Sequence, residues 1–441
     1  MSDAIRPTTG DSSWFTHDRF GLFIHWGLYA MAARHEWVKS KEFIRDDEYD
    51  GKYFKRFDPD LYDPQLWAAA ASDAGMKYFV ITTKHHEGFC LWDSKHTDYK
   101  APNTPAGRDL LRPMVDAFRG RDMRVGFYHS LIDWHHPHYI VDRCNHPCRD
   151  LGDDELTEMN KGRDQARYAE YLHAQVRELL SDFGKVDVLW FDFSFGDETK
   201  EPAFVHGKGH RAWNSAELVK MIRELQPDIL LDNRLDLPDV PESWDFLTPE
   251  QAQPRAWVEH EGQRVVWEAC QTFSGSWGYY RDEHGWRSVK QLLQTLIDCV
   301  SKGGNLLLNV GPTGRGEFDA RALDRLSGMG EWMKRHDRSI YGCTQAPDEF
   351  PTPRDCRLTY NPQAKRLYVH ILDWPYKHLV LPGKAYLDQV AYAQLLHDGS
   401  EVKLGTDAWS AKQVGTADGQ TVHLPQQQPD VSVPVVELYL K

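Results

Sequence analysis

Five apolar segments of the sequence end in polar or aromatic side chains that could do chemistry. They end at His25-Trp26, Lys84-His85-His86-Glu87, Tyr128-His129-Ser130, Asp192 and Asp232-Asn233-Arg234. Asp192 closes the run Val-Asp-Val-Leu-Trp-Phe, and a carboxylate at a strand end has the fixed backbone that a nucleophile needs. A loop acid or a helix cap is the alternative interpretation of Asp192.

Acid/base catalysis needs a second carboxyl group. Four glutamates downstream of Asp192 are candidates: Glu250, Glu259, Glu261 and Glu268. The residue types alone do not choose among them.

The adjacent histidines His85 and His86 are candidate ligand contacts. On an extended strand their rings would point to opposite faces, so both reach one pocket only if the chain bends just past the strand end. Structural histidines are the alternative.

The segment Trp134 to Cys148 is rich in metal-ligand residue types. It holds His135, His136, His138, Cys144, His146 and Cys148. Imidazole and thiolate are ligands that zinc accepts, and here three residues separate the two cysteines. A metal-dependent hydrolase that uses residues 135–148 is therefore a second functional hypothesis.

Aromatic residues and histidines are abundant, with 16 Trp, 19 Tyr, 19 Phe and 21 His. Several occur together in Trp267-Glu268 and in Ser276-Trp277-Gly278-Tyr279-Tyr280. Flat apolar faces with polar edges suit a sugar pocket, and they also suit a well-packed core.

The elements that must position these residues alternate between strands and helices. Strands are predicted at Phe20–His25, Tyr78–Thr83, Arg124–His129, Val186–Phe191, Ile229–Asp232 and Asn305–Val310, and helices at Pro64–Ala74, Leu110–Phe118, Arg163–Phe183, Ala216–Leu225 and Val289–Val300. Parallel strands need such crossovers, so the sequence predicts a (β/α)8 barrel, in which chemistry lies at the C-terminal ends of the strands. No G-x-G-x-x-G motif follows the first strand, so a nucleotide-binding sheet lacks its fingerprint.

The pattern changes near residue 345, where short strand-like runs separated by Pro, Gly, Asp and Asn begin. These runs are Arg357–Tyr360, Arg366–Ile371, His378–Leu381, Val390–Ala393, Thr421–Leu424 and Val435–Leu440. They predict a small antiparallel β-sandwich. We therefore expect two domains, a barrel over residues 1–345 and a sandwich over residues 346–441.

Charge and cysteine content restrict the partners and the compartment. The 52 basic and 66 acidic side chains give a net charge of −14, which disfavours nucleic acid and anionic membranes as partners. The seven scattered cysteines suit a reducing compartment better than a disulfide framework. With no signal peptide apparent, we expect a cytoplasmic protein.

The ordered motifs resemble the α-L-fucosidases of glycoside hydrolase family 29. The matching stretches are 19–27 (RFGLFIHWG), Glu36-Trp37, 84–89 (KHHEGF), Tyr128-His129-Ser130, 189–192 (LWFD), Asp232-Asn233-Arg234, 276–279 (SWGY) and 301–312 (SKGGNLLLNVGP). Each motif is weak alone, but the ordered set, over about residues 14 to 345, is specific.

The resemblance implies a retaining exo-hydrolase that removes terminal α-L-fucose from fucosylated oligosaccharides or glycans through a covalent fucosyl-enzyme. It implies no metal or organic cofactor, makes Asp192 the nucleophile, and favours Glu250 as the acid/base with Glu268 as runner-up. The residues matching the family's sugar pocket are His25, Glu36, Trp37, His85, His86, Tyr128, Trp190, Arg234 and Trp277. Whether copies assemble into a homo-oligomer stays open.

One departure from the family concerns Phe193, because family members often have Gly after the nucleophile. We therefore expect a bulkier side chain beside Asp192, at the bottom of the site. A third hypothesis is a carbohydrate-binding relative without catalysis, against which the presence of both Asp192 and Glu250 argues.

Overall fold

The computed structural model describes residues 4–194, 207–405 and 419–441. Its centre is a parallel sheet in the order β5-β4-β3-β2-β1-β10-β9-β6. The strands are β1 (Phe20–Ile24), β2 (Tyr78–Lys84), β3 (Arg124–Ser130), β4 (Val188–Asp192), β5 (Leu230–Leu231), β6 (Phe246–Leu247), β9 (Val266–Thr272) and β10 (Asn305–Val310). A parallel bridge between Asp232 and Phe246 joins the two edges. The eight strands thus form a nearly closed barrel, which confirms the predicted fold class.

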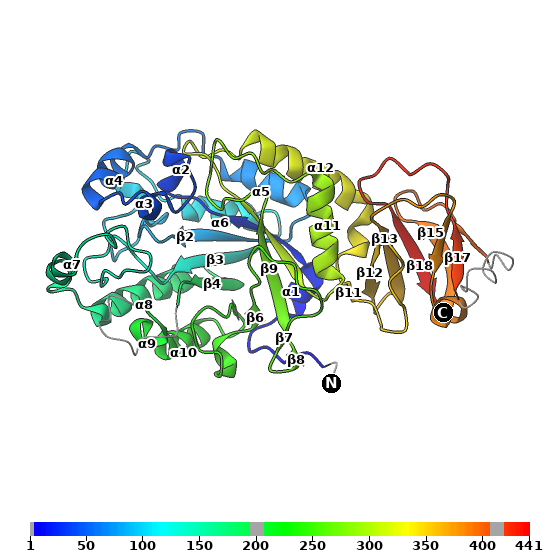
Figure 1. Cartoon of the computed structure of the whole chain (residues 1–441). Coiled ribbons are helices and arrows are strands. Elements are labelled where there is room, and N and C mark those ends of the chain that lie inside the picture. The colour runs from blue at the N-terminus through cyan, green and yellow to red at the C-terminus, as the bar shows by residue number, and fades with distance from the viewer. Residues whose placement is uncertain (1–3, 195–206, 406–418) are drawn as a thin grey trace.

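Helices cover the outside of the barrel (Figure 1). The longer ones are α5 (Pro64–Asp73), α6 (Leu111–Arg119), α8 (Gln165–Asp182), α10 (Ser215–Leu225), α11 (Val289–Val300) and α12 (Ala320–His336). Shorter ones are α1 (Ser13–Asp18), α2 (Tyr29–Ala32), α3 (Val38–Lys41), α4 (Asp46–Lys52), α7 (Asp153–Asn160) and α9 (His210–Trp213). The capping box that starts α11 joins Ser288 and Gln291, and it fixes the residue at which this helix begins.

Two barrel strands lie in a stretch where the sequence indicated no regular structure. β6 has only two residues, and β9 follows a loop that carries the hairpin of β7 (Glu259–His260) and β8 (Gln263–Arg264). A 3-10 turn at Pro241–Ser243, in place of an α-helix, connects β5 to β6. Because no α-helix lies between β5 and β6, this part of the sequence lacks the alternation of strand and helix patterns that predicts a barrel. α12 was also absent from the prediction.

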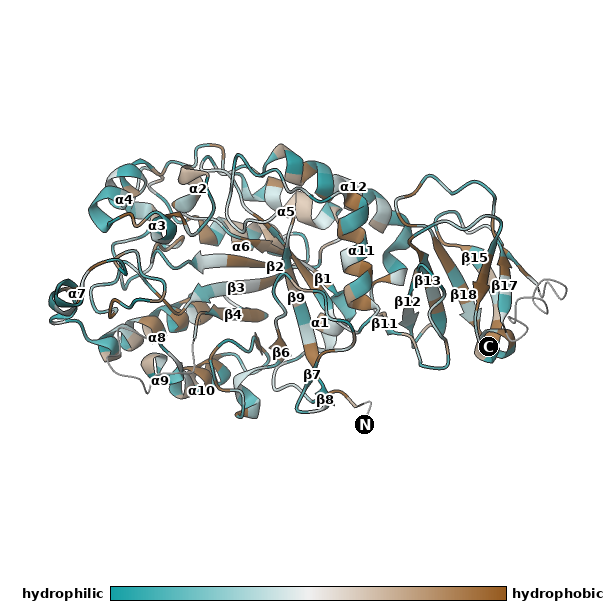
Figure 2. Ribbon diagram, in the orientation of Figure 1, coloured by the Kyte–Doolittle hydropathy of each residue, from teal (hydrophilic) through white to brown (hydrophobic). Residues whose placement is uncertain are grey.

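The alternation of side chains along each strand separates two apolar layers. In β4, Leu189 and Phe191 point outward to the helices, whereas Val188 and Trp190 point into the barrel. Asp192 continues the inward series and so reaches the interior at the strand's C-terminal end. The strands are largely hydrophobic, while the surrounding helices mix hydrophobic and hydrophilic residues (Figure 2).

Beyond the barrel lie two antiparallel sheets. One has the order β11-β12-β13-β18-β15 and the other β14-β17-β16. The strands are β11 (Thr344–Gln345), β12 (Cys356–Asn361), β13 (Arg366–Ile371), β14 (His378–Leu381), β15 (Val390–Leu395), β16 (Lys403–Gly405), β17 (Gln420–His423) and β18 (Val435–Leu440), with α13 (Lys384–Gln389) between β14 and β15. Leu367, Leu381, Val422 and Leu438 form part of one apolar core between the sheets. The predicted β-sandwich is therefore present.

The sandwich lies at the end of the molecule away from the C-terminal ends of β2 and β3 (Figure 1). It packs on α12, where the Trp332 indole donates to the Val433 carbonyl at 2.7 Å. Among the described residues, no helix is long and apolar enough to cross a membrane.

Candidate active site

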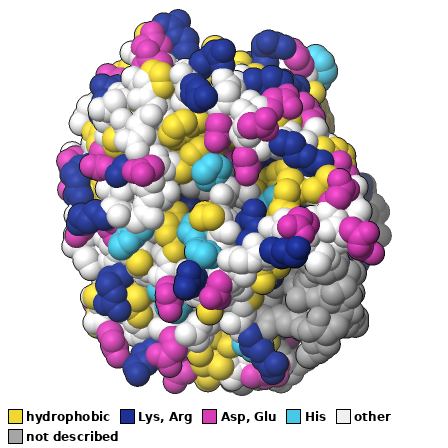
Figure 3. Space-filling model, turned by 90° about the vertical axis from the view of Figure 1, so that its left-hand side faces the viewer, with side chains coloured by type: hydrophobic (Ala, Val, Ile, Leu, Met, Phe, Trp, Pro, Cys, Tyr) yellow, Lys and Arg dark blue, Asp and Glu magenta, His cyan; other side chains and the backbone are white. Residues whose placement is uncertain are grey.

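A cavity of about 430 Å³ opens at the C-terminal ends of the barrel strands. It is lined by Phe23, His25, Trp37, His85, His86, Tyr128, Trp190, Asp192, Phe193, Ser194, Asn233, Arg234, Asp236, Pro238, Glu250, Cys270 and Trp277. On the face that carries the strand ends, histidine and apolar side chains gather near the middle of a mixed-charge surface (Figure 3). Ten of the twelve residues named from the sequence line this cavity, and Glu36 and Glu268 do not.

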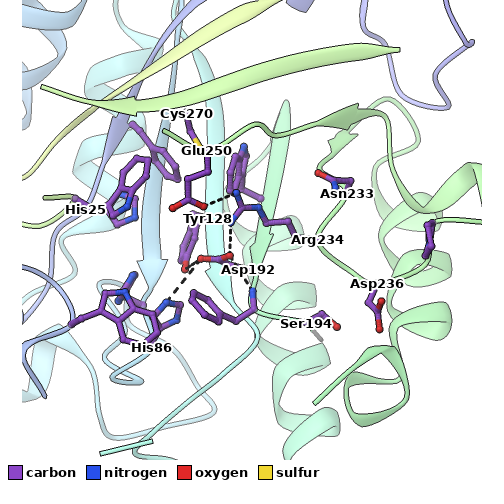
Figure 4. A pocket seen from close by; sticks show the side chains of 17 residues that line it. His25, His86, Tyr128, Asp192, Ser194, Asn233, Arg234, Asp236, Glu250 and Cys270 are labelled. Atoms are coloured by element: carbon purple, nitrogen blue, oxygen red, sulfur yellow. Dashed lines mark hydrogen bonds and ion pairs between the residues drawn. The ribbon is translucent and has the colours of Figure 1, made fainter. Parts of the chain in front are cut away.

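Asp192 lies at the centre of the cavity and both its oxygens accept hydrogen bonds (Figure 4). Oδ1 accepts from Arg234 Nη1 at 2.7 Å and from the Phe193 amide at 3.0 Å. Oδ2 accepts from the Tyr128 hydroxyl at 2.9 Å and lies 4.0 Å from His86 Nε2. Arg234, the Phe193 amide and the Tyr128 hydroxyl therefore fix the orientation of the Asp192 side chain.

Arg234 joins the two candidate catalytic carboxylates. While Nη1 contacts Asp192, Nη2 donates to Glu250 Oε2 at 2.9 Å. The remaining nitrogen, Nε, donates to the Thr248 hydroxyl at 3.0 Å, and that hydroxyl donates to Asn233 Oδ1 at 3.0 Å. The guanidinium plane is therefore fixed at all three nitrogens, and it holds both carboxylates on one side of the cavity.

Two histidines in the cavity have a defined neutral tautomer. His86 Nδ1 lies 2.7 Å from Ser130 Oγ, whose proton is donated to the Ile132 carbonyl, so His86 Nδ1 is the donor. His25 Nδ1 donates to Asn309 Oδ1 at 2.6 Å, because the Asn309 amide nitrogen donates to the Trp277 carbonyl. In both rings Nε2 is left as an acceptor.

Burial keeps these rings uncharged. It lowers the pKa of His25 to about 3 and the pKa of His86 well below its ordinary value. His86 Nε2 is buried and has no hydrogen-bond partner among the described residues. A buried acceptor without a partner is costly, so this nitrogen is suited to a ligand hydroxyl.

The bend expected after the second strand is present. β2 ends at Lys84, and His85 and His86 both line the cavity. Gly88 follows with φ +85°, and a Cβ there would lie 2.3 Å from an Asp133 oxygen. Only glycine fits this turn.

Glu36 lies behind the cavity wall. Its side chain is buried, and Oε2 accepts from the Gly278 amide at 2.8 Å, beside Trp277. Burial raises the pKa of Glu36. In this structure Glu36 therefore holds the loop that carries Trp277, whose ring packs 5.2 Å from that of His25.

Glu268 points into the barrel one layer below the cavity. It accepts hydrogen bonds from the Tyr78 hydroxyl and from Trp190 Nε1, and it is fully buried. Burial raises its pKa to about 7. Cys270, two residues further along β9, is the inward residue that reaches the cavity. Glu268 thus sits beneath Trp190, away from the cavity that Asp192 and Glu250 share.

Sequence reasoning did not select Phe23, Ser194, Asn233, Asp236, Pro238 and Cys270 as site residues, although all of them line the cavity. Phe193, expected as a bulkier floor, does lie there and packs 4.6 Å from His86 and 5.1 Å from Trp37. Asn233 and Asp236 come from the loop after β5, where a strand end with polar residues was visible.

The histidines of residues 135–148 make contacts that do not resemble a metal site. His135 stacks on Tyr99 at 3.7 Å and lies 3.4 Å from Asp50. Both nitrogens of His146 are used, one on the Trp134 carbonyl and one by the Cys148 amide. Within residues 4–194, 207–405 and 419–441, no three His, Cys, Asp or Glu side chains are placed to hold a metal ion. The geometry therefore does not favour the metal-dependent alternative.

Comparisons with known proteins point to one family. A family model described as alpha-L-fucosidase matches residues 7–338. Human plasma alpha-L-fucosidase is 29% identical over 386 residues, which cover 82% of this chain and 76% of that protein.

Solved structures extend the similarity to the whole chain. Alpha-L-fucosidase isoenzyme 1 from Paenibacillus thiaminolyticus is 47% identical, with a TM-score of 0.88 and 98% of each chain covered. A family 29 alpha-L-fucosidase from Bacteroides thetaiotaomicron, a covalent intermediate trapped with 2-fluoro-fucosyl fluoride in a mutant, is 26% identical with a TM-score of 0.80 and covers 100% of this chain and 99% of its own.

The family model spans most of the chain, and the barrel, the sandwich and the ordered motifs agree with it. The protein therefore belongs to the α-L-fucosidase family of glycoside hydrolases, family 29.

Proposed function

We propose that the protein is a retaining exo-α-L-fucosidase that releases terminal fucose from fucosylated oligosaccharides or glycans, with Asp192 as nucleophile and Glu250 as acid/base. The observation that carries the proposal is the pair of carboxylates on one guanidinium, Asp192 at 2.7 Å and Glu250 at 2.9 Å from Arg234. Retaining hydrolysis requires two carboxyl groups about 5–5.5 Å apart, and a shared guanidinium favours such a short separation.

In the first step Asp192 attacks the anomeric carbon. Oδ2 is the attacking oxygen, because Oδ1 already accepts two hydrogen bonds and Oδ2 accepts one. The glycosidic bond breaks as the ester forms, and the leaving oxygen takes a proton from Glu250. Arg234 and Tyr128 stay with the carboxylate and orient it.

In the second step Glu250 removes a proton from water, whose oxygen attacks the anomeric carbon and expels Asp192. The ester has no charge, so Arg234 then faces Glu250 alone. Glu250 gave up its proton in the first step, and the guanidinium holds it in place for its role as base. Fucose leaves with its original anomeric configuration, and both carboxyl groups return to their starting protonation.

The cavity provides hydrogen-bond acceptors and an apolar surface for the sugar. The Nε2 atoms of His25 and His86 accept from ring hydroxyls, as their tautomers require. Trp277 and Phe23, whose rings lie 6.0 Å apart, provide an apolar surface for the C5 methyl group of fucose. The combination suits a deoxy sugar that is neutral and bears several hydroxyls.

Mechanism-based labelling tests the proposal. Incubation of this protein with 2-fluoro-fucosyl fluoride should add one fluorofucosyl group, and peptide mapping should place it on Asp192. The first sugar released from an aryl α-L-fucoside should be the α anomer by NMR. Release of the β anomer, or a label on another residue, would exclude the assigned roles.

A further inference from the structure

The cavity continues past the two carboxylates, away from the histidines. Figure 4 shows Asn233 and Asp236 on the side of Arg234 opposite His25 and His86. Both residues line the same cavity and belong to the loop after β5. If fucose occupies the compartment with the histidines, this outer compartment faces whatever is attached to it.

One carboxylate oxygen of Asp236 contacts His210, and the other is available to a ligand. Oδ2 accepts from the His210 amide at 3.1 Å and lies 3.3 Å from His210 Nδ1. Oδ1 has no hydrogen-bond partner within the described part of the chain. The side chain is 22% exposed. Asp236 also has φ +58°, a left-handed conformation that costs energy and often marks a functional residue.

Asn233 has the complementary arrangement. Its Oδ1 accepts from both the backbone amide and the hydroxyl of Thr248, at 3.2 and 3.0 Å. This fixes the orientation of the amide and turns Nδ2, a donor, away from Thr248. The loop therefore presents one acceptor and one donor to the outer compartment.

We propose that Asp236, with Asn233, forms a subsite for the leaving sugar and selects fucosides of neutral sugars that carry adjacent ring hydroxyls. One hydroxyl donates to Asp236 Oδ1 and its neighbour accepts from Asn233 Nδ2. The carboxylate also repels leaving groups that carry a sulfate or a carboxylate. This inference rests on the proposed function, because it assumes that the fucosyl bond lies between the two compartments.

The test combines two substitutions with two changes of substrate. Asp236→Ala removes the acceptor, and Asp239→Ala, in the same loop and exposed, is the matched control. Substrates are an aryl α-L-fucoside, a fucosyl-disaccharide with a neutral hexose in the linkage that the wild type cleaves fastest, and analogues of it that lack single hydroxyls of the hexose.

Asp236→Ala should lower kcat/KM for the disaccharide about tenfold more than for the aryl fucoside, mainly through KM, as expected for one hydrogen bond to a charged group. Removal of the hydroxyl bound by Asp236 should cost the wild type a similar factor and the variant nothing further. Asp239→Ala should behave as the wild type on every substrate.

Equal losses on aryl and disaccharide substrates would mean that Asp236 only supports the fold, and would overturn the subsite. A deoxygenation effect that persists unchanged in the variant would do the same. Failure of the wild type to cleave any fucoside would instead reject the proposed function, so the two failures are distinguishable.

Discussion

At the scale of single residues, the assignment of Asp192 makes a chemical prediction. Asp192→Gly should lower kcat for an aryl α-L-fucoside by roughly 10⁴-fold or more, because no group replaces the nucleophile. Added azide fits the space left by the carboxylate, and should restore part of the activity with release of β-fucosyl azide, as NMR would detect. Turnover within tenfold of the wild type would contradict the assignment.

Glu250 and Glu268 should respond differently to substitution. Glu250→Ala should spare the first step with an activated aryl leaving group and slow the cleavage of sugar leaving groups by about 10²–10⁴-fold, because only the latter need a proton. Steady-state kinetics over a series of leaving groups measures this.

Glu268→Ala should act on stability instead. It leaves the buried Tyr78 hydroxyl and Trp190 N–H without an acceptor, which costs about 1–3 kcal/mol for each group. The thermal midpoint should fall without any dependence of kinetics on the leaving group. A leaving-group dependence in Glu268→Ala but not in Glu250→Ala would transfer the acid/base role to Glu268.

Residue patterns located most of the candidate site, because strand ends in a barrel converge on one face. Asp192, His25 and Arg234 follow apolar runs directly, so their position could be inferred. The positions of Glu36 and Glu268 could not be inferred in this way. Similarity to a family motif does not show whether a side chain lines the cavity or lies behind its wall. Glu268 points inward like Cys270, but it belongs to the layer below the cavity.

At the scale of elements, the turn after β4 carries a strained residue. Phe193 has φ +69°, a conformation that costs a non-glycine residue about 1–2 kcal/mol. Its ring packs against Trp37 and His86, and this contact offsets the backbone cost.

A pair of variants separates these two effects. Phe193→Ala loses the ring and keeps the strain, whereas Phe193→Gly loses both. We expect both to be less stable than the wild type, with the glycine variant more stable than the alanine variant by about 1 kcal/mol, as measured by denaturant unfolding. An alanine variant as stable as the glycine variant would show that the turn is unstrained.

The elements themselves were predictable where periodicity is strong. In α8, Tyr168, Leu172, Val176 and Leu179 follow one another at helical spacing, and all four are buried. β6 was not predicted because two residues are too few to show an alternating pattern. β9 was not predicted because its seven consecutive buried positions include the polar residues Glu268, Gln271 and Thr272. Interior polar residues interrupt the apolar pattern on which strand prediction depends.

At the scale of the whole molecule, two histidines lie where the sandwich meets the barrel. His336 ends α12, and its ring stacks on Trp332, which also binds Val433 of the sandwich. His370 in β13 donates from Nε2 to the Thr359 hydroxyl, which donates to the Ser339 carbonyl. Nε2 of His336 and Nδ1 of His370 are buried, and neither has a partner within the described segments.

Protonation of either ring would bury a charge without an acceptor. Burial lowers the pKa of His336 to about 4 and of His370 to about 3, whereas the unfolded chain titrates near 6.5. Both rings therefore contribute full stability above pH 6.5, and this contribution decreases as the pH falls toward the folded values. For His336 alone the loss between pH 7.5 and pH 5 is about 2 kcal/mol.

Acidification should therefore lower the thermal midpoint, and His336→Phe should reduce this pH dependence. Phenylalanine keeps the stacking on Trp332 but does not titrate. Between pH 7.5 and pH 5 the midpoint should fall less for His336→Phe than for the wild type, with His17→Gln, at an exposed ring, as the control. Parallel curves for wild type and His336→Phe would show that this contact between barrel and sandwich is insensitive to acid.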